Sequence, residues 1–153
     1  TLDGTLFPYT TLFRSLFKYK MKYLIITGGI YHLICALFHI AFPGLYKWNL
    51  LIKDINQTKK YHIKDIIYTS NSLIGLIWLM FAALSFFMSD ELISTRLGNF
   101  ILYIITGIWF VRIFILFPIY TGFRNIFSLL RFIFFIIGFI LYLIPSLSAV
   151  YNY

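Results

Sequence analysis

Residues 126–150 read IFSLLRFIFFIIGFILYLIPSLSAV, a continuous run in which Arg131 is the one charged side chain. A helix needs about 20 predominantly apolar residues to cross the hydrocarbon core of a bilayer. Three further runs reach that length, at residues 23–42, 66–88 and 97–117. Because backbone groups find no water inside a bilayer, spanning segments are helices or closed barrels, and these runs lack the strict alternation of barrel strands. The sequence therefore predicts an all-α bundle of four transmembrane helices.

The composition of the whole chain supports this interpretation. Of its 153 residues, 61% are hydrophobic and only 12% are charged, whereas a soluble domain carries about 25% charged residues. The mean hydropathy is +0.87, which excludes intrinsic disorder. So few polar side chains could not cover the surface of a water-soluble globule. The length allows one domain, and we expect a single integral membrane domain over residues 21–153.

Residues 1–20 are expected to be a non-native or disordered leader. The segment Thr5 to Ser15, TLFPYTTLFRS, resembles the conceptual translation of a common sequencing adapter, and the resemblance runs without a break through the segment. Processing and cloning scars are set aside before the fold is considered. Met21 follows a short basic stretch and is the expected start, with the true start placed between residues 16 and 21.

The connections between the apolar runs differ in length and charge. The first, residues 43–65, opens with Pro43-Gly44, which is expected to end the first helix, and it carries five lysines. Within it Leu45, Trp48 and Leu51 recur at helical spacing, which predicts a short amphipathic helix in the membrane interface. The second connection, 89–96, and the third, 121–125, are short.

The distribution of lysine and arginine predicts the orientation, because positive charge stays in the cytoplasm. The first and third connections together hold six basic residues. The opposite side holds Lys22 and Arg96, with Lys18 and Lys20 added if the leader is native. We therefore expect a bacterial inner (plasma) membrane protein with both termini outside the cytoplasm. Since the basic residues lie at the ends of apolar runs, the expected partner is the lipid bilayer and not nucleic acid.

Each predicted span carries one polar residue near the same membrane face. These residues are His39, Asn71, Arg112 and Arg131. At a rise of 1.5 Å per residue, they lie about 5–8 Å from the predicted inner edge of the membrane. With the tryptophan one turn before Arg112, the candidate binding layer comprises His39, Asn71, Trp109, Arg112 and Arg131. His32, about 10 Å further towards the midplane, is a second candidate.

Two interpretations of this layer stay open. In one, the arginines snorkel to the lipid phosphates while His39 and Asn71 bond neighbouring backbone carbonyls. In the other, the layer is a cationic pocket for an anionic lipid headgroup or a small anion. The four apolar runs contain no Asp or Glu, so an arginine that points inward lacks a carboxylate partner within the spans, and this favours either snorkelling or an anionic ligand.

No enzymatic machinery is visible in the sequence. His32 and His39 are about 10 Å apart along one helix, too far to share a metal, and no Ser-His-Asp or paired-carboxylate arrangement is present. The single cysteine, Cys35, excludes an internal disulfide. We expect no metal and no cofactor, and a non-enzymatic accessory subunit or a binder of lipid or small anion. The alternative is a membrane-embedded redox or other enzyme that uses His32 and His39.

A resemblance adds to the fold prediction. Residues 21–153 are similar to small, uncharacterised bacterial membrane proteins of four spans. The motifs that carry the resemblance are the two histidines of the first span, a Phe-Pro and a Trp element after it, and a Trp-x-x-Arg motif: His32, His39, Phe42-Pro43, Trp48, and Trp109 with Arg112. The resemblance implies a four-span fold and carries no activity with it.

Overall fold

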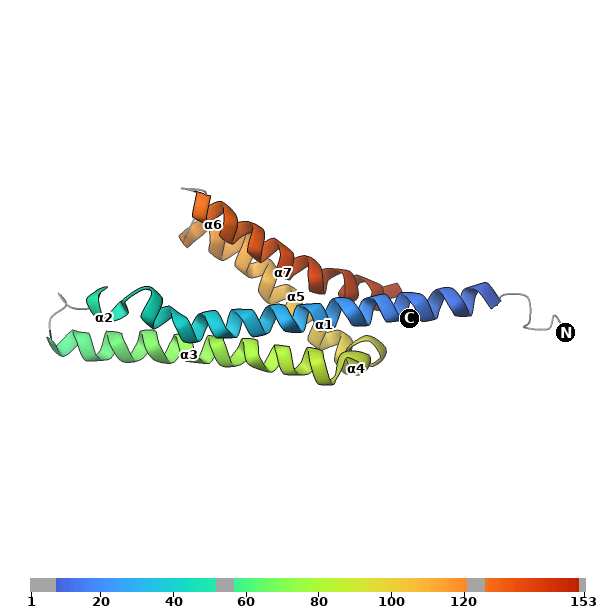
Figure 1. Cartoon of the computed structure of the whole chain (residues 1–153), viewed down its shortest axis with the longest axis horizontal. Coiled ribbons are helices and arrows are strands. Elements are labelled where there is room, and N and C mark those ends of the chain that lie inside the picture. The colour runs from blue at the N-terminus through green and yellow to red at the C-terminus, as the bar shows by residue number, and fades with distance from the viewer. Residues whose placement is uncertain (1–7, 52–56, 121–125, 152–153) are drawn as a thin grey trace. The chain divides into compact units, whose positions relative to one another are not determined.

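The computed structural model describes residues 8–51, 57–120 and 126–151, and this part of the chain is helical without a strand. Figure 1 shows the elements in chain order. They are α1 (Pro8–Leu45), α2 (Trp48–Leu51), α3 (Gln57–Phe87), α4 (Ser89–Ser94), α5 (Arg96–Val111), the π-helical segment η1 (Arg112–Leu116), α6 (Phe117–Tyr120) and α7 (Ile126–Tyr151).

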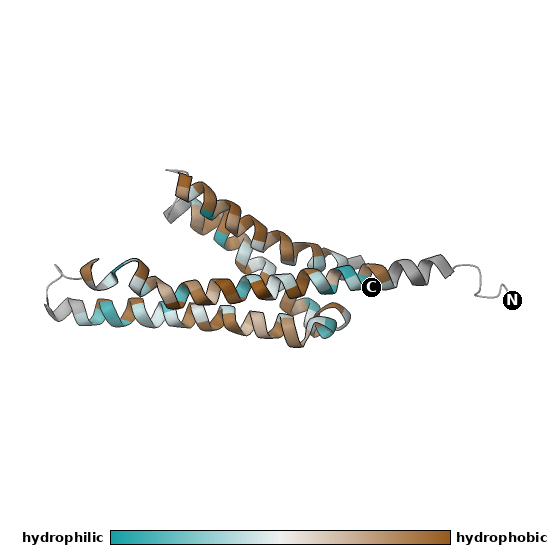
Figure 2. Cartoon of the chain, viewed as in Figure 1, coloured by the Kyte–Doolittle hydropathy of each residue, from teal (hydrophilic) through white to brown (hydrophobic). Residues whose placement is uncertain are grey.

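Four helical segments are long and apolar enough to cross a membrane, namely Ser15–Leu45, Tyr61–Phe87, Arg96–Leu116 and Ile126–Ser148. They match the four predicted runs, and α2 is the short helix expected in the first connection. Figure 2 shows how strongly hydrophobic α5 and α7 are along most of their length.

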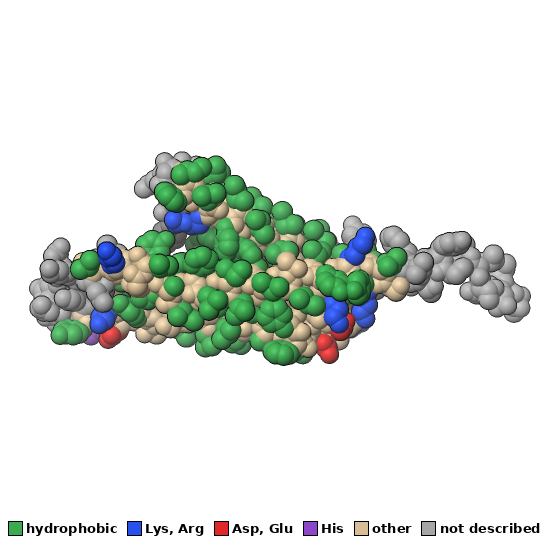
Figure 3. Space-filling model, in the orientation of Figure 1, with side chains coloured by type: hydrophobic (Ala, Val, Ile, Leu, Met, Phe, Trp, Pro, Cys, Tyr) green, Lys and Arg blue, Asp and Glu red, His purple; other side chains and the backbone are tan. Residues whose placement is uncertain are grey.

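The outward-facing side chains of these helices are themselves apolar. Ile40, Phe87 and Phe127 are 75%, 84% and 72% exposed, and hydrophobic side chains cover much of the helix surface visible in Figure 3. Leaving apolar surface in water costs roughly 25 cal/mol per Å², so lipid is the environment that suits this surface. The four-span, all-α membrane fold is confirmed.

Helix α1 extends beyond the predicted first span at both ends. It begins at Pro8, so residues 8–20 are helical, while the origin of residues 1–20 as a non-native leader remains a prediction. It ends at Leu45 and contains Pro43, so the expectation that Pro43-Gly44 would end the helix is wrong by one turn. A proline removes one backbone hydrogen bond from a helix, and the side chain that compensates for this loss is described below.

The chain forms two compact units. Unit 1 comprises Thr1–Gly28 with Ser85–Tyr153, and unit 2 comprises Gly29–Leu84. In unit 2, the second half of α1 and most of α3 run antiparallel, side by side (Figure 1). In unit 1, α5 packs along α7, and the hydroxyls of Thr106 and Ser146 lie 2.8 Å apart across that contact.

Tyr142 joins three helices inside unit 1. Its side chain is fully buried, and its hydroxyl lies 2.6 Å from the hydroxyl of Ser85 at the end of α3. A Cβ atom at Gly28 of α1 would lie 2.5 Å from the Tyr142 ring. Glycine at this position therefore makes room for the ring, which in turn reaches its hydrogen-bond partner.

The turn between α4 and α5 is compact for two reasons. The Thr95 hydroxyl accepts a hydrogen bond from the Gly98 N–H and donates one to the Glu91 carbonyl, both at 2.9 Å, so it caps α5 and closes α4. A Cβ atom at Gly98 would overlap the backbone of Glu91 and Leu92. Only glycine allows the two helices to approach so closely, and the position of the α4 side chains is fixed as a result.

Candidate functional site

His39 and Asn71 form a reciprocal hydrogen-bonded pair inside unit 2. The Asn71 side-chain amide donates to the His39 carbonyl at 2.6 Å, and its oxygen lies 2.9 Å from His39 Nδ1. Because the amide nitrogen is used on the carbonyl, the amide oxygen must accept from Nδ1, which therefore carries a proton. Both residues are buried.

Pro43 explains why this pair is needed. In a helix the N–H of residue 43 would bond the carbonyl of residue 39, but proline has no N–H. The His39 carbonyl thus loses its helical donor, and an unsatisfied buried carbonyl costs about 1–3 kcal/mol. The Asn71 amide from α3 supplies the missing donor, which is why α1 continues past Pro43 to Leu45.

Gly75 brings α3 close enough for this contact. It lies one turn after Asn71, and a Cβ atom there would come within 3.2 Å of the His39 Cβ. Small residues at helix contacts let membrane helices approach closely. The geometry therefore gives His39, Asn71 and Gly75 a shared role in holding α1 against α3.

His32 lies in an aromatic environment in unit 2. It is fully buried, with its ring centroid 5.0 Å from Trp78 and 5.6 Å from Phe81. Within the described residues, no three His, Cys, Asp or Glu side chains are grouped so as to hold a metal ion. These surroundings favour a packing role for His32.

Arg112 lies on aromatic rings in unit 1. Its guanidinium carbon is 4.5 Å from the ring centre of Phe135 on α7 and 5.9 Å from that of Trp109 on α5, within the range of cation–π attraction. Trp109 is fully buried and Phe135 nearly so, with their ring centres 6.1 Å apart. The guanidinium therefore lies against two neighbouring aromatic rings, which we call the ring platform.

The backbone at Arg112 is also unusual, because this residue begins the π-helical segment η1. The Phe117 N–H bonds the Arg112 carbonyl, five residues back. Pro118 follows directly; it offers no N–H and its ring crowds the carbonyl four residues before it, which is a physical reason for the wider turn. Single π turns within α-helices occur frequently at functional sites.

Arg131 is exposed on α7, one turn before Phe135 in the sequence. The described acidic residues of unit 1 are Asp90 and Glu91 in α4. They precede α5, whose length separates Arg96 from Arg112 by about 24 Å. The end of unit 1 formed by η1 and the start of α7 therefore carries positive charge.

The structure divides the predicted binding layer between the two units. It brings His39 and Asn71 together in unit 2, and Arg112 and Trp109 together in unit 1. A single layer across all four helices remains a prediction.

Two features of unit 1 were not predicted from the sequence. The Lys22–Asp90 ion pair joins residues far apart in the chain, and no local pattern signals it. The Ser85–Tyr142 hydrogen bond has a weak signal, since a glycine on one span can indicate a bulky neighbour on another.

Comparison with known proteins does not extend these observations. No family model, curated protein or solved structure matches the chain.

Proposed function

We propose that this four-span membrane protein is a non-enzymatic binder of a phosphate-bearing anion, either an anionic lipid headgroup or a small free anion. The observation that carries the proposal is the position of Arg112. Its guanidinium lies over the Phe135 and Trp109 rings at the first residue of a π turn. We also propose that the chain is related to the small bacterial four-span proteins that its motifs resemble. This relationship is compatible with a binding function.

The chemistry of arginine suits this ligand. A guanidinium presents its N–H donors in a planar fork that matches two phosphate oxygens at once. Contact with the ring platform restricts the Arg112 side chain, so less conformational entropy is lost when an anion binds. Arg131, one turn from Phe135 and exposed, supplies a second cation whose long stem reaches the headgroup level.

The depth of Arg112 favours a lipid source for the anion. It lies four residues before the end of the span Arg96–Leu116, or about 6 Å along the axis. Basic pockets between transmembrane helices on the cytoplasmic side commonly bind anionic headgroups. We propose that this end faces the cytoplasm of a bacterial inner membrane, with both termini outside, from the count of basic residues in the connections.

Reporter fusions test the orientation. Fusions after residue 56 and after residue 153 should report the cytoplasm and the outside, respectively. Fusions that report the same side would show that the number of crossings is wrong, and a cytoplasmic report from residue 153 would reverse the orientation.

The ligand is tested with Arg112→Leu, with Arg96→Leu at the opposite end of α5 as the matched control. Native mass spectrometry counts the phospholipids retained from membranes, and titration of delipidated protein with inorganic phosphate measures the free anion. We expect Arg112→Leu to lose a retained anionic phospholipid while Arg96→Leu keeps it. Loss of phosphate binding alone would identify a free anion as the ligand. Unchanged retention and unchanged phosphate binding would overturn the proposal.

The enzymatic alternative has its own test. Metal analysis and absorbance near the haem Soret band of the purified protein should show no stoichiometric cofactor. A cofactor bound through His32 or His39 would contradict the non-enzymatic proposal.

A further inference from the structure

At the end of unit 1 opposite to Arg112, a surface groove carries charges of both signs. It has a volume of about 510 Å³ and lies between α1 and α4, within the usual size range of small-ligand sites, about 300–1,000 Å³. Its polar lining consists of one serine, two lysines, two tyrosines and one carboxylate: Ser15, Lys18, Lys22, Tyr19, Tyr23 and Asp90.

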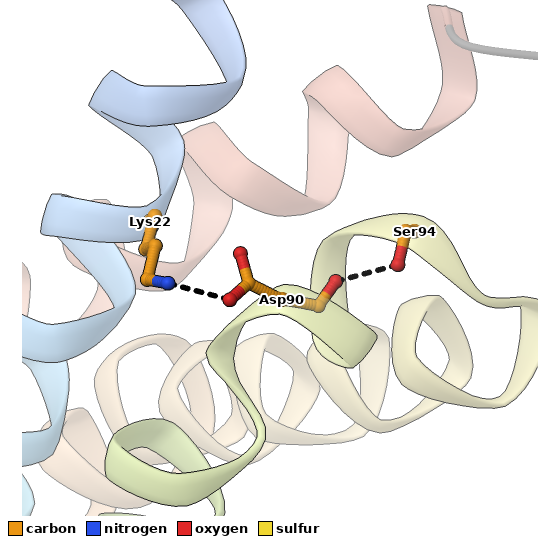
Figure 4. Close-up of polar contacts among 3 residues, drawn as sticks. All are labelled: Lys22, Asp90 and Ser94. Atoms are coloured by element: carbon orange, nitrogen blue, oxygen red, sulfur yellow. Dashed lines mark hydrogen bonds and ion pairs between the residues drawn. The ribbon is translucent and has the colours of Figure 1, made fainter.

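Lys22 from α1 holds the Asp90 carboxylate, while Ser94 bonds the Asp90 backbone, as Figure 4 shows. Lys22 Nζ from α1 bonds Asp90 Oδ2 at 2.5 Å, and the Ser94 hydroxyl donates to the Asp90 carbonyl at 2.6 Å. The hydrogen bond from Lys22 and the charge of Lys18 keep the pKa of Asp90 below its ordinary value. The groove therefore holds a fixed negative charge beside two positive charges.

The length of the first span is compatible with a groove at headgroup depth. The helical span that contains it, Ser15–Leu45, has 31 residues, about 46 Å at 1.5 Å per residue, whereas the hydrocarbon core is about 30 Å thick. One end of this span must extend into the headgroup region. Tyr19 and Tyr23, whose rings meet edge to face at 4.5 Å, are of the residue type that is enriched at that level.

We propose that this groove binds the headgroup of an amine-bearing phospholipid, with Lys22 on its phosphate and Asp90 on its ammonium group. A headgroup with a phosphate but no cation would bring a second negative charge towards Asp90, which is unfavourable. A zwitterion with a primary ammonium group satisfies both signs, and its N–H groups donate to the carboxylate. This site and its lipid are independent of the proposed Arg112 site.

The test uses the full 153-residue chain in nanodiscs with equal amounts of phosphatidylethanolamine, phosphatidylcholine and phosphatidylglycerol. Phosphatidylcholine has a quaternary amine that cannot donate a hydrogen bond, and phosphatidylglycerol has no amine. Native mass spectrometry counts the lipids retained. We expect phosphatidylethanolamine to be preferred over phosphatidylcholine by about fivefold or more, because one additional charge-assisted hydrogen bond is enough to produce a preference of this size.

Matched variants assign the preference to the groove. Asp90→Asn should reduce the preference to about onefold, while Glu91→Gln, in the same turn but outside the groove lining, should preserve it. Lys22→Gln should lower total retention of this lipid, and Lys20→Gln, also outside the lining, should not. Arg112→Leu should leave the preference intact, which separates this site from the first.

Three outcomes would overturn the proposal. One is a wild-type chain without a preference for the primary amine. Another is an Asp90→Asn protein that stays helical by circular dichroism and keeps the preference. The third is an equal loss in Glu91→Gln, which would show that the effect is not specific to the groove.

Discussion

Asn71 and Arg112 are both polar residues predicted near the same membrane face, yet their side chains make different kinds of contact in the two units. In unit 2, the Asn71 amide is used within the fold, on the His39 carbonyl and ring. In unit 1, Arg112 brings a full charge to a platform of ring faces. A ring face attracts a cation through the electrostatic field of its π electrons.

The difference separates a structural polar residue from a binding candidate. An asparagine in a span is accounted for when it replaces a hydrogen bond that a nearby proline removes. A positive charge at the end of a span, on oriented rings and beside a second cation, suits an external anion. The predictions below test whether this division is correct.

The largest effect is expected from Gly28→Ala, which tests whether unit 1 depends on tight packing. The new Cβ would lie 2.5 Å from the Tyr142 ring, displacing it from Ser85. Overpacking costs about 1–3 kcal/mol, measured as the free energy of unfolding in detergent. Gly107→Ala is the control, because a Cβ there meets nothing within 4 Å; it should be neutral or stabilise by up to about 1 kcal/mol. Equal effects of the two variants would contradict the packing account.

Asn71→Leu tests the structural half of the comparison. It removes both hydrogen bonds of the pair and should destabilise the protein by about 1–2 kcal/mol, a typical upper range for interhelical hydrogen bonds in membranes. In a Pro43→Ala background the same change should cost about 1 kcal/mol less, because residue 43 regains an N–H for the His39 carbonyl. Additive effects in this double-mutant cycle would show that Asn71 does not compensate for Pro43.

A smaller effect on stability is expected from low pH, which acts on the Lys22–Asp90 ion pair at the end of unit 1 opposite to Arg112. Because Lys22 keeps the pKa of Asp90 below its ordinary value, the folded protein binds fewer protons there than the unfolded chain. The ion pair should therefore stabilise the fold at neutral pH, and this contribution should disappear as the pH falls through the lowered pKa. Thermal unfolding of Asp90→Asn should lack this component; an identical pH profile in wild type and variant would contradict it.

The smallest effect is expected from deletion of residues 1–20, which should change neither membrane insertion nor the free energy of unfolding. Both quantities are measured against the full chain in the same membranes. A clear loss of either would show that the leader is part of the folded protein, and that helix α1 needs its first turns.

The fold was largely predictable because span length and hydrophobicity are local properties. The stripes of small and polar residues were informative too: His32, Asn71 and Tyr142 are all buried. The extension of α1 past Pro43 could not be predicted, because it depends on a side chain from another helix. The Lys22–Asp90 pair was missed for the same reason, since it depends on how α4 is placed beside α1.

The residue types of the candidate site could be predicted from the sequence, but the contacts between helices and the backbone geometry at Arg112 could not. Helical periodicity places Trp109 and Arg112 on one face, and the structure confirms that they meet. The ring of Phe135 beneath the guanidinium and the π turn at Arg112 depend on the packing of α7 and on Pro118, respectively. Neither is encoded in the spacing of one span.

The most direct test of the central division compares Arg112→Leu and Asn71→Leu in one experiment. Native mass spectrometry of both variants and the wild type, purified from the same membranes, counts the anionic phospholipid retained by each. We predict that Arg112→Leu loses this lipid with little change in stability, whereas Asn71→Leu loses stability and keeps the lipid. Retention by Arg112→Leu together with loss by Asn71→Leu would contradict the assignment of Asn71 to structure and Arg112 to binding.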